Sequence, residues 1–274
     1  NYIAFGTYLH KDLYNKPTIE GRNNALISPS GFFDGEKFHE FNHLDVTEHV
    51  KHSWYEDVAA AHPWKEPIPT PIASQNLENT NFDGKYSWSK APRYMGKPAE
   101  AGPLARCLMY GNPNNLDHQI QDPLFLDIMS KFGPSVFTRT LARVHEAPRL
   151  YQYIHQWLGE IRLDDEFYIK PEERDGFGFG ATEAARGALA HWIEIKNGVI
   201  ENYQVMAPTT WNVGPNDEMG MSGPIEAALE GTEIEDTNDP VEVGMVARSF
   251  DSCLVCTVHA HDAKTNKKLT QFKL

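Results

Sequence analysis

The sequence predicts a mixed α+β fold, with a helical-bundle core and peripheral antiparallel β-hairpins. Apolar residues recur at helical spacing between residues 118 and 161, over a length typical of bundle helices. Asp34-Gly35 and Asn197-Gly198 each separate two short apolar runs, which is the arrangement of a β-hairpin. Of the 274 residues, 41% are hydrophobic and 23% charged, so the chain can bury a substantial core as one or two domains.

The first hundred residues are predicted to be rich in strands and irregular structure. Within them, "LISPSGFFDGEKFHEF" predicts two strands around Asp34-Gly35. Closely spaced prolines in 63–104 exclude long helices, so this stretch is predicted to be a long ordered loop or a linker. Its aromatic residues indicate that it packs against another part of the chain; these are Tyr86, Trp88 and Tyr94.

Two helices are predicted in the middle of the chain, at 122–131 and 134–161, with a break near Gly133-Pro134. Ala147-Pro148 is expected to kink the second helix, because an internal proline removes a backbone hydrogen bond. Asn197-Gly198 then gives the clearest hairpin signal, within "ALAHWIEIKNGVIENYQVM".

Two short helices are predicted nearer the C-terminus. Ser222 is the expected N-cap of the first, with Pro224 in its first turn and Gly231 at its end. Asp239 is the expected N-cap of the second, and Pro240 its first residue. The second helix is expected to bury an apolar face, made of Val241, Met245 and Val246.

Charge and cysteine content narrow the classes of function. The net charge is −13 and basic residues are scattered, apart from Lys264, Lys267 and Lys268, so we expect no nucleic-acid partner. No stretch approaches the roughly 20 apolar residues of a membrane-spanning helix, and no signal peptide is visible. Three cysteines do not make a disulfide framework and favour a reducing compartment or a metal role. The chain begins with Asn, so we expect that the gene product starts elsewhere.

The strongest chemical signal is a CxxCxxH motif formed by Cys253, Cys256 and His259. Two thiolates at this spacing can bind one metal, and a structural zinc site would need four ligands, with His261 as the fourth. A thioredoxin-like redox pair is an alternative, although such pairs begin a helix and this pair follows one. Spacing alone favours a metal and leaves the redox role and no role open. Cys107 lies in an apolar helical pattern and is expected to be a buried, inert thiol.

"RSFDSCLVCTVH" resembles the C-terminal DPCxxCxxH motif of [NiFe] hydrogenase large subunits. Four further blocks resemble the same family, in its order: "TEHVKHSWYED", "YSWSKAPRYMGKPAEAGPLAR", "TEAARGALAHWIEI" and "NYQVMAPTTWNVGPNDEMGMSGPIEAALEG". The resemblance therefore covers most of the chain. Ser252 and the "CTVHAHD" ending are most similar to uptake-type enzymes of the cyanobacterial kind.

The resemblance implies an enzyme that oxidises H2 at a Ni–Fe cluster carrying CO and cyanide on the iron. Cys253 would be a terminal nickel thiolate and the first proton acceptor, and Cys256 would bridge the two metals. Arg186 would lie over the open face of the cluster, held by Asp251. Other residues are implied to surround the iron and its ligands: Thr209, Pro208, Ala185 and Leu189. A magnesium ion would be bound by His259 and by the backbone carbonyl of Val205.

Four departures from the family pattern affect these expectations. The N-terminal motif with the first CxxC is absent, so the chain supplies only half of the cysteine ligands and is expected to be inactive alone. Ala185 stands where proline is common, which puts the contacts to cyanide in doubt. Asn216 stands where the family often has Arg, and Ser252 replaces the usual Pro.

The resemblance also implies partners and a division of the chain. The partners would be an iron–sulfur small subunit, the missing N-terminal part of the large subunit in the same or a separate chain, a maturation protease and nickel-insertion factors. We expect a β-rich and irregular segment at 1–100, a helical-bundle and metal-site region at 101–259, and an extension at 260–274 that is removed on maturation.

Residues 180–259 are expected to converge on one buried point. The expected location is the cytoplasm or the cytoplasmic face of a membrane, with the periplasm as the alternative. The alternative functions are a non-catalytic hydrogenase-like subunit of a redox complex and a generic zinc module.

Overall fold

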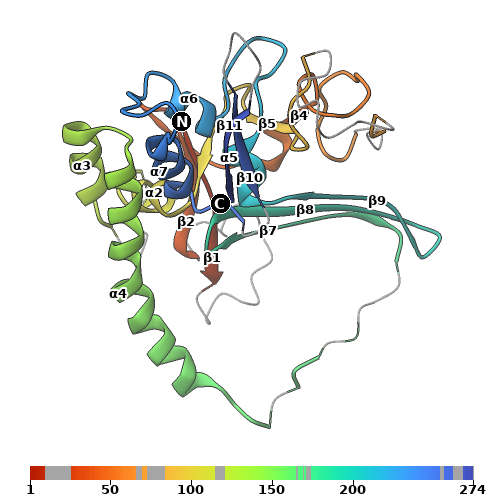
Figure 1. Ribbon diagram of the computed structural model, residues 1–274. Coiled ribbons are helices and arrows are strands. Elements are labelled where there is room, and N and C mark those ends of the chain that lie inside the picture. Colours follow the sequence, from red (N-terminus) through yellow and green to blue (C-terminus); the bar gives the residue numbers. More distant parts are fainter. Residues whose placement is uncertain are drawn as a thin grey trace.

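The computed structural model describes residues 1–9, 26–65, 70–72, 84–114, 121–164, 166–168, 170, 174–253, 256–261 and 268–273 (Figure 1). A four-stranded sheet has the order β3-β2-β1-β6. Its strands are β1 Tyr2–Leu9, β2 Leu26–Phe33, β3 Phe38–His39 and β6 Glu100–Ala101. The hairpin predicted around Asp34-Gly35 is confirmed, since β2 pairs antiparallel with β3 across that turn. β6 instead runs parallel to β1.

A second hairpin prediction is also confirmed. β7 (Gly176–Ala184), β8 (Gly187–Lys196) and β9 (Val199–Met206) form a three-stranded antiparallel sheet. Asn197 and Gly198 both have positive φ, 53° and 72°, as a tight two-residue turn between twisted strands requires. One end of this sheet lies in the body of the molecule, and the other end extends away from it (Figure 1).

The proline-rich stretch is more regular than the sequence predicts. β5 (Ala91–Tyr94) and β6 both lie within 63–104, and β5 pairs with β4 (Val46–His49). The expectation that this stretch packs against the chain is confirmed. Tyr94 is fully buried against Phe32, and the ring of Trp88 lies edge-on to that of Trp54.

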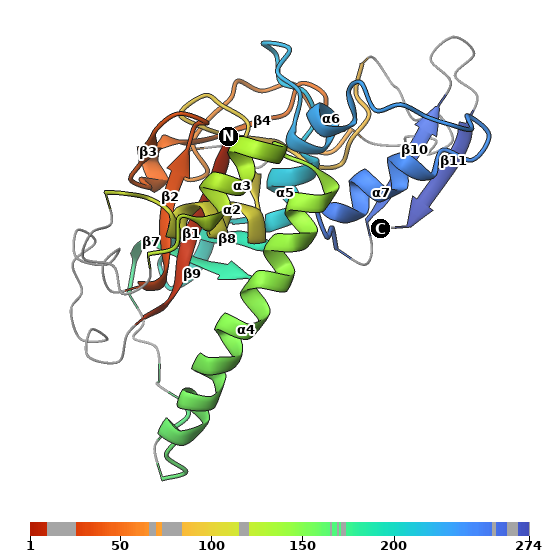
Figure 2. The same ribbon diagram turned by 90° about the vertical axis from the view of Figure 1, so that its left-hand side faces the viewer.

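The two central helices are confirmed as α3 (Leu124–Phe132) and α4 (Val136–Glu160). Ser135 caps α4 through a capping box with Thr138. Helix α4 continues through Pro148, and its C-terminal half extends away from the rest of the described chain (Figures 1 and 2). The other regular elements are α2 Pro103–Tyr110, α5 Pro208–Val213, α6 Pro224–Leu229, α7 Val241–Ser249, a 3-10 turn His43–Asp45, β10 Thr257–His261 and β11 Lys268–Lys273.

Both predicted caps near the C-terminus are wrong. Gly223 rather than Ser222 caps α6, because the Ser222 hydroxyl instead donates to Glu230 at 2.6 Å. Pro240 rather than Asp239 precedes α7. The predicted apolar face of α7 is also wrong, since Val241 and Met245 are about half exposed.

The buried residues of α7 are small: Gly244, Ala247 and Ser249. Small side chains allow the helix to approach its neighbours α4 and α6 closely. Helix α7 therefore buries the face with the smallest side chains, which allows close packing, and not the face with the largest apolar area.

The mixed α and β class is confirmed, and the core is shared between strands and helices. Successive side chains of β1 alternate between two buried clusters, as strand geometry requires. Ile3 and Phe5 join a cluster with β8 and α5, including Trp192 and Trp211. On its other face, β1 packs against α2 and α4. The strand is thus covered on both sides.

Figure 2 shows the β10–β11 hairpin beyond α7, on the opposite side of the molecule from β2 and β3. Among the described residues, no helix combines the length and apolar character needed to cross a bilayer.

Candidate functional site

The two C-terminal cysteines lie in a tight turn that follows α7. Asp251, directly after the helix, has a positive φ of 53°, which reverses the chain direction. The Cys256 backbone N–H donates to the Cys253 carbonyl at 2.9 Å. Both side chains are partly buried. A turn of this kind places two thiols on one side of the backbone, as a shared metal ligand pair requires.

Thr209 connects this turn to the start of α5. Pro208 opens the helix, where its missing N–H costs nothing, and Thr209 is the next residue. The Thr209 Oγ1 accepts from the Cys253 backbone N–H at 3.3 Å and lies 3.2 Å from the Cys253 Sγ. Since the N–H is the donor in the first contact, the hydroxyl proton is available for the sulfur.

Arg186 approaches the same turn from the loop between β7 and β8. Its Nε lies 3.7 Å from Asp251 Oδ1. Arg143, on α4, lies 3.8 Å from the other carboxylate oxygen of Asp251. Both Nε atoms are buried, and neither has a hydrogen-bond partner among the residues that the structure describes. Asp251 therefore lies between two guanidinium groups without closing a hydrogen bond to either Nε.

Several neighbours shift the pKa of the Cys256 thiol, in opposite directions. Burial is the main cause that raises the pKa of the Cys256 thiol, and the adjacent Cys253 raises it further. Arg186 acts in the opposite direction and favours the thiolate. A metal ion bound to Cys256 would deprotonate this thiol despite its burial, because coordination stabilises the thiolate directly.

The structure thus brings together Thr209, Cys253, Cys256, Asp251 and Arg186. Pro208 is buried beside Thr209. Ala185 is exposed in the β7–β8 turn. Leu189, the third residue of β8, is half-buried. The side chain of His259 lies outside the described residues, although its backbone belongs to β10.

Val205 lies on β9, opposite His191 of β8. Its neighbour Gln204 donates to Glu48, a fully buried carboxylate that also accepts from Lys90 Nζ at 3.0 Å. The side chain of the residue before Val205 is therefore tied to a buried ion pair.

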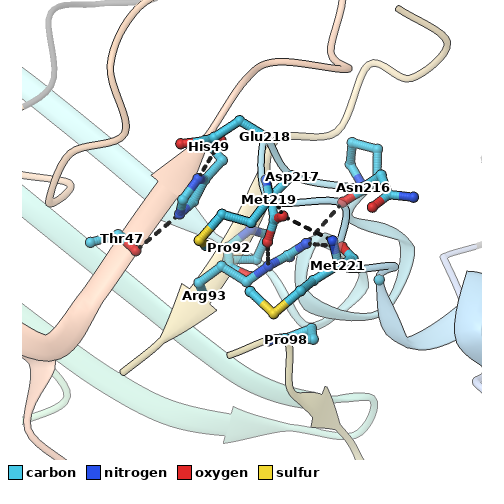
Figure 3. Close-up of polar contacts among 12 residues, drawn as sticks. Thr47, His49, Pro92, Arg93, Pro98, Asn216, Asp217, Glu218, Met219 and Met221 are labelled. Carbon is cyan, nitrogen blue, oxygen red and sulfur yellow. Dashed lines mark hydrogen bonds and ion pairs between the residues drawn. The ribbon is translucent and has the colours of Figure 1, made fainter. Parts of the chain in front are cut away.

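A separate polar cluster fixes the loop that follows α5 (Figure 3). Arg93, fully buried on β5, donates through Nε to Asp217 Oδ2 at 2.7 Å and through Nη2 to the carbonyls of Pro215 and Met221. Asp217 Oδ1 in turn accepts from the N–H groups of Met219 and Met221. Figure 3 also shows His49, which bonds Glu218 at 2.7 Å. Helix α5 is therefore anchored at its C-terminal end as well.

Cys107 is fully buried on α2, away from the candidate site, and burial raises the pKa of its thiol strongly. The expectation that Cys107 is buried is thus confirmed, and its lack of a chemical role stays a prediction. Within the described ranges, no group of three His, Cys, Asp or Glu side chains is arranged to hold a metal ion.

Sequence reasoning missed the arginines that support this region, namely Arg93, Arg106 and Arg143. Each lies in an otherwise apolar or proline-containing stretch, such as "APRY" or "PLARCLMY". A lone charge in such a stretch is a usable signal, because a buried charge requires a partner. The acidic partner of such an arginine cannot be identified from the local sequence, because it lies far away along the chain.

Comparison with known proteins gives consistent results. Residues 1–259 match the family described as nickel-dependent hydrogenase. The quinone-reactive Ni/Fe-hydrogenase large chain of Wolinella succinogenes is 35% identical, over 96% of this chain and 50% of its own length. The periplasmic [NiFeSe] hydrogenase large subunit of Desulfomicrobium baculatum is 36% identical, over 98% of this chain and 51% of its own.

Solved structures agree with the sequence comparisons. The reduced, active Ni-Fe-Se hydrogenase of Desulfomicrobium baculatum superposes with a TM-score of 0.74 at 32% identity, covering 92% of this chain and 50% of that one. The reduced Ni-Fe-Se hydrogenase of D. vulgaris Hildenborough gives 0.76 at 28% identity. The chain therefore spans about half the length of the curated relatives that it matches.

Proposed function

Because the chain belongs to the nickel-dependent hydrogenase family, we propose that it supplies the C-terminal half of the catalytic site of an uptake-type enzyme that cleaves H2 heterolytically. The observation that carries this proposal is the meeting of Thr209, Cys253 and Cys256 beside Arg186. These groups come from three separate parts of the chain, so their proximity is a property of the fold and not of the motif alone.

The residues present fit a nickel–iron group with CO and cyanide on the iron. Two partly buried thiols are soft ligands that suit nickel and iron. The buried Arg186 Nε, which has no partner among the described residues, can donate to a polar ligand such as cyanide. When bound, the group supplies the redox-active centre at which H2 is split and from which electrons leave.

The chain's own residues would hold this group and move a proton. Cys253 and Cys256 would be ligands, with Cys253 as the first proton acceptor. The Thr209 hydroxyl, 3.2 Å from the Cys253 sulfur, would orient that sulfur. Arg186 would keep a fixed positive charge next to Cys256, and Asp251 would limit its position. Pro208, Ala185 and Leu189 would form the surroundings of the iron.

A magnesium ion would lie near Val205 and His259 in this proposal. The Val205 carbonyl and the His259 imidazole would be its protein ligands, with water oxygens completing the coordination shell. The ion would then order the strand that leads into Pro208 and Thr209.

The partners follow from the names of the relatives, which are large chains or large subunits. We propose an iron–sulfur small subunit as the electron acceptor, together with the remaining large-subunit segment, a nickel-insertion system and a protease that removes 260–274. The family match ends at residue 259, which supports that boundary. The cytoplasmic location stays a prediction, and the periplasmic relative is consistent with the alternative.

The test is metal analysis and H2-dependent dye reduction in the intact enzyme that contains this chain, purified with its small subunit. We expect nickel and iron together, and activity. Protein that folds and assembles but binds no metal would support the non-catalytic subunit instead, and zinc alone would support a zinc module.

A further inference from the structure

Arg106, on α2, is a buried arginine that reaches the turn carrying Arg186. Its Nη1 donates to the carbonyl of Ala184 at 3.0 Å, and its Nη2 to the carbonyl of Ala185 at 3.1 Å. These are the two residues directly before Arg186 in the chain. The Arg106 guanidinium group thus holds the backbone that directly precedes Arg186.

Arg106 is itself rigidly held. Its Nε and Nη2 bond the two carboxylate oxygens of Glu146, on α4, both at 2.7 Å. Its Nη1 also bonds Glu183 Oε2 at 2.9 Å, and the other oxygen of Glu183 accepts from the Phe5 N–H at 2.6 Å. Bidentate pairing of this kind fixes orientation as well as position. The cluster joins α2, α4, β7 and β1 at the base of the turn.

The turn has no free space on its other side. Gly187 has a φ of 128°, and a Cβ placed there would lie 2.6 Å from the Gly102 nitrogen and 2.9 Å from the Ala101 carbonyl carbon. A Cβ at Gly102 would in turn lie 3.3 Å from the Arg186 carbonyl oxygen. The two glycines prevent the turn from moving toward α2, and the hydrogen bonds from Arg106 prevent it from moving away.

The Arg186 side chain is held much less firmly than its backbone. Its Nε is 3.7 Å from Asp251 and lacks a hydrogen bond within the described part of the chain. The position of the Arg186 guanidinium group therefore depends mainly on the backbone of the β7–β8 turn.

We propose that Arg106 is a positioning residue for Arg186, which sets where that charge lies relative to Cys256. This inference rests on the proposed function. A lysine could not replace Arg106, because a single ammonium group cannot bridge two carbonyls and two carboxylates in one plane.

The test is a double-mutant cycle in the intact enzyme, with Arg106→Lys, Arg186→Lys and the double variant. Arg106→Lys is expected to reduce H2 oxidation by about tenfold or more in the parent enzyme and to have no further effect beside Arg186→Lys, since coupled residues are non-additive. Arg93→Lys is the matched control, because Arg93 is equally buried but bonds the loop after α5. Its effect is expected to add fully to that of Arg186→Lys. Additive loss for Arg106→Lys as well would overturn the proposal.

A second readout does not depend on activity. Amide hydrogen exchange in residues 183–188 is expected to accelerate by about tenfold or more in Arg106→Lys and to stay unchanged in Arg93→Lys. Unchanged exchange in Arg106→Lys would also overturn the proposal. If Arg106→Lys does not accumulate, Glu146→Gln decides the question by the same two measurements, because it loosens Arg106 and keeps the side-chain shape. A parent enzyme without nickel or H2 oxidation would refute the proposed function, while the exchange experiment would still test the role of Arg106.

Discussion

The buried arginines of the scaffold and the partly exposed arginines beside the cysteines differ in how their Nε atoms are paired. Arg93 and Arg106 use their guanidinium donors on carboxylates and carbonyls at 2.7–3.2 Å. Arg143 and Arg186, at the candidate site, face Asp251 at 3.7–3.8 Å through Nε atoms that lack partners in the described structure. The Nε donors around the site are therefore paired, whereas the two Nε donors within it have no partner among the described residues. This division suits a site that must bind a further group without rearranging its frame.

The largest effect should come from a ligand at the site. Cys253→Ser is expected to reduce bound nickel to background, because a serine hydroxyl is a hard and weakly acidic ligand compared with a thiolate. Nickel per protein, measured by mass spectrometry, tests this, with the thermal midpoint as a folding control. Cys107→Ala should retain nickel, since that thiol is buried elsewhere. Equal nickel loss in both variants would contradict the assignment.

The next largest effect should fall on the scaffold. Arg93→Met leaves Asp217 buried without its cation, which is expected to lower the free energy of unfolding by about 3–5 kcal/mol. Denaturant titration measures this change. The matched control is Lys97→Met, which removes an exposed pair with Asp34 at 3.5 Å and should cost about 0–1 kcal/mol. Similar losses in the two variants would mean that the buried cluster contributes no more than a surface contact.

The tight turn gives a third contrast. Gly187→Ala combines a positive φ with contacts below 3 Å to backbone, so we expect a loss of about 2–4 kcal/mol. Gly198→Ala has a positive φ in open space and should cost about 1–2 kcal/mol. Thermal denaturation of the two variants compares them directly. If Gly198→Ala proved the more damaging, the close approach of the β7–β8 turn to α2 would be wrong.

A smaller effect is expected at Thr209. Thr209→Val keeps the shape but leaves the Cys253 N–H without its acceptor, for a loss of about 1 kcal/mol in unfolding free energy. Thr209→Ser keeps the hydroxyl and should lie within about 0.5 kcal/mol of the parent. A parent-like Thr209→Val would show that this contact does not stabilise the turn.

The smallest effect concerns pH and the His62 environment. Burial lowers the pKa of His62, so the unfolded state binds more protons than the folded state once the pH falls below about 6.5. Stability contributed by neutral His62 is therefore lost as pH falls. Glu183 acts oppositely, because burial raises its pKa to about 7. The useful measurement is thus the difference in unfolding free energy between the parent and His62→Gln at pH 7.5 and 5.5, where the advantage of the parent should shrink. An advantage that grows toward pH 5.5 would contradict the direction of the shift.

Local features of the fold, such as hairpins, could be predicted from sequence. The long-range ion pairs that hold these features in place could not. The Asn197-Gly198 hairpin depends on two adjacent residues, so its signal is contained in them. The cap at Ser222 failed because its hydroxyl bonds Glu230 instead, and the cap at Asp239 failed because α7 begins one residue later than predicted. The site residues were predicted through resemblance to a family. The Arg93–Asp217 pair, separated by 124 positions, leaves no periodic or local trace that a single sequence could reveal.

The contact between Phe5 and Glu183 has a consequence for the order of events during synthesis. β1 precedes the CxxC motif by about 250 positions in this chain, and domains begin to fold from their N-terminal side as they emerge from the ribosome. The hydrogen bond from Phe5 fixes a carboxylate that holds Arg106, and thereby the β7–β8 turn. The turn that carries Arg186 can therefore be fixed in place while the two thiols are still being translated, so that the cysteines are the last of these groups to join the fold.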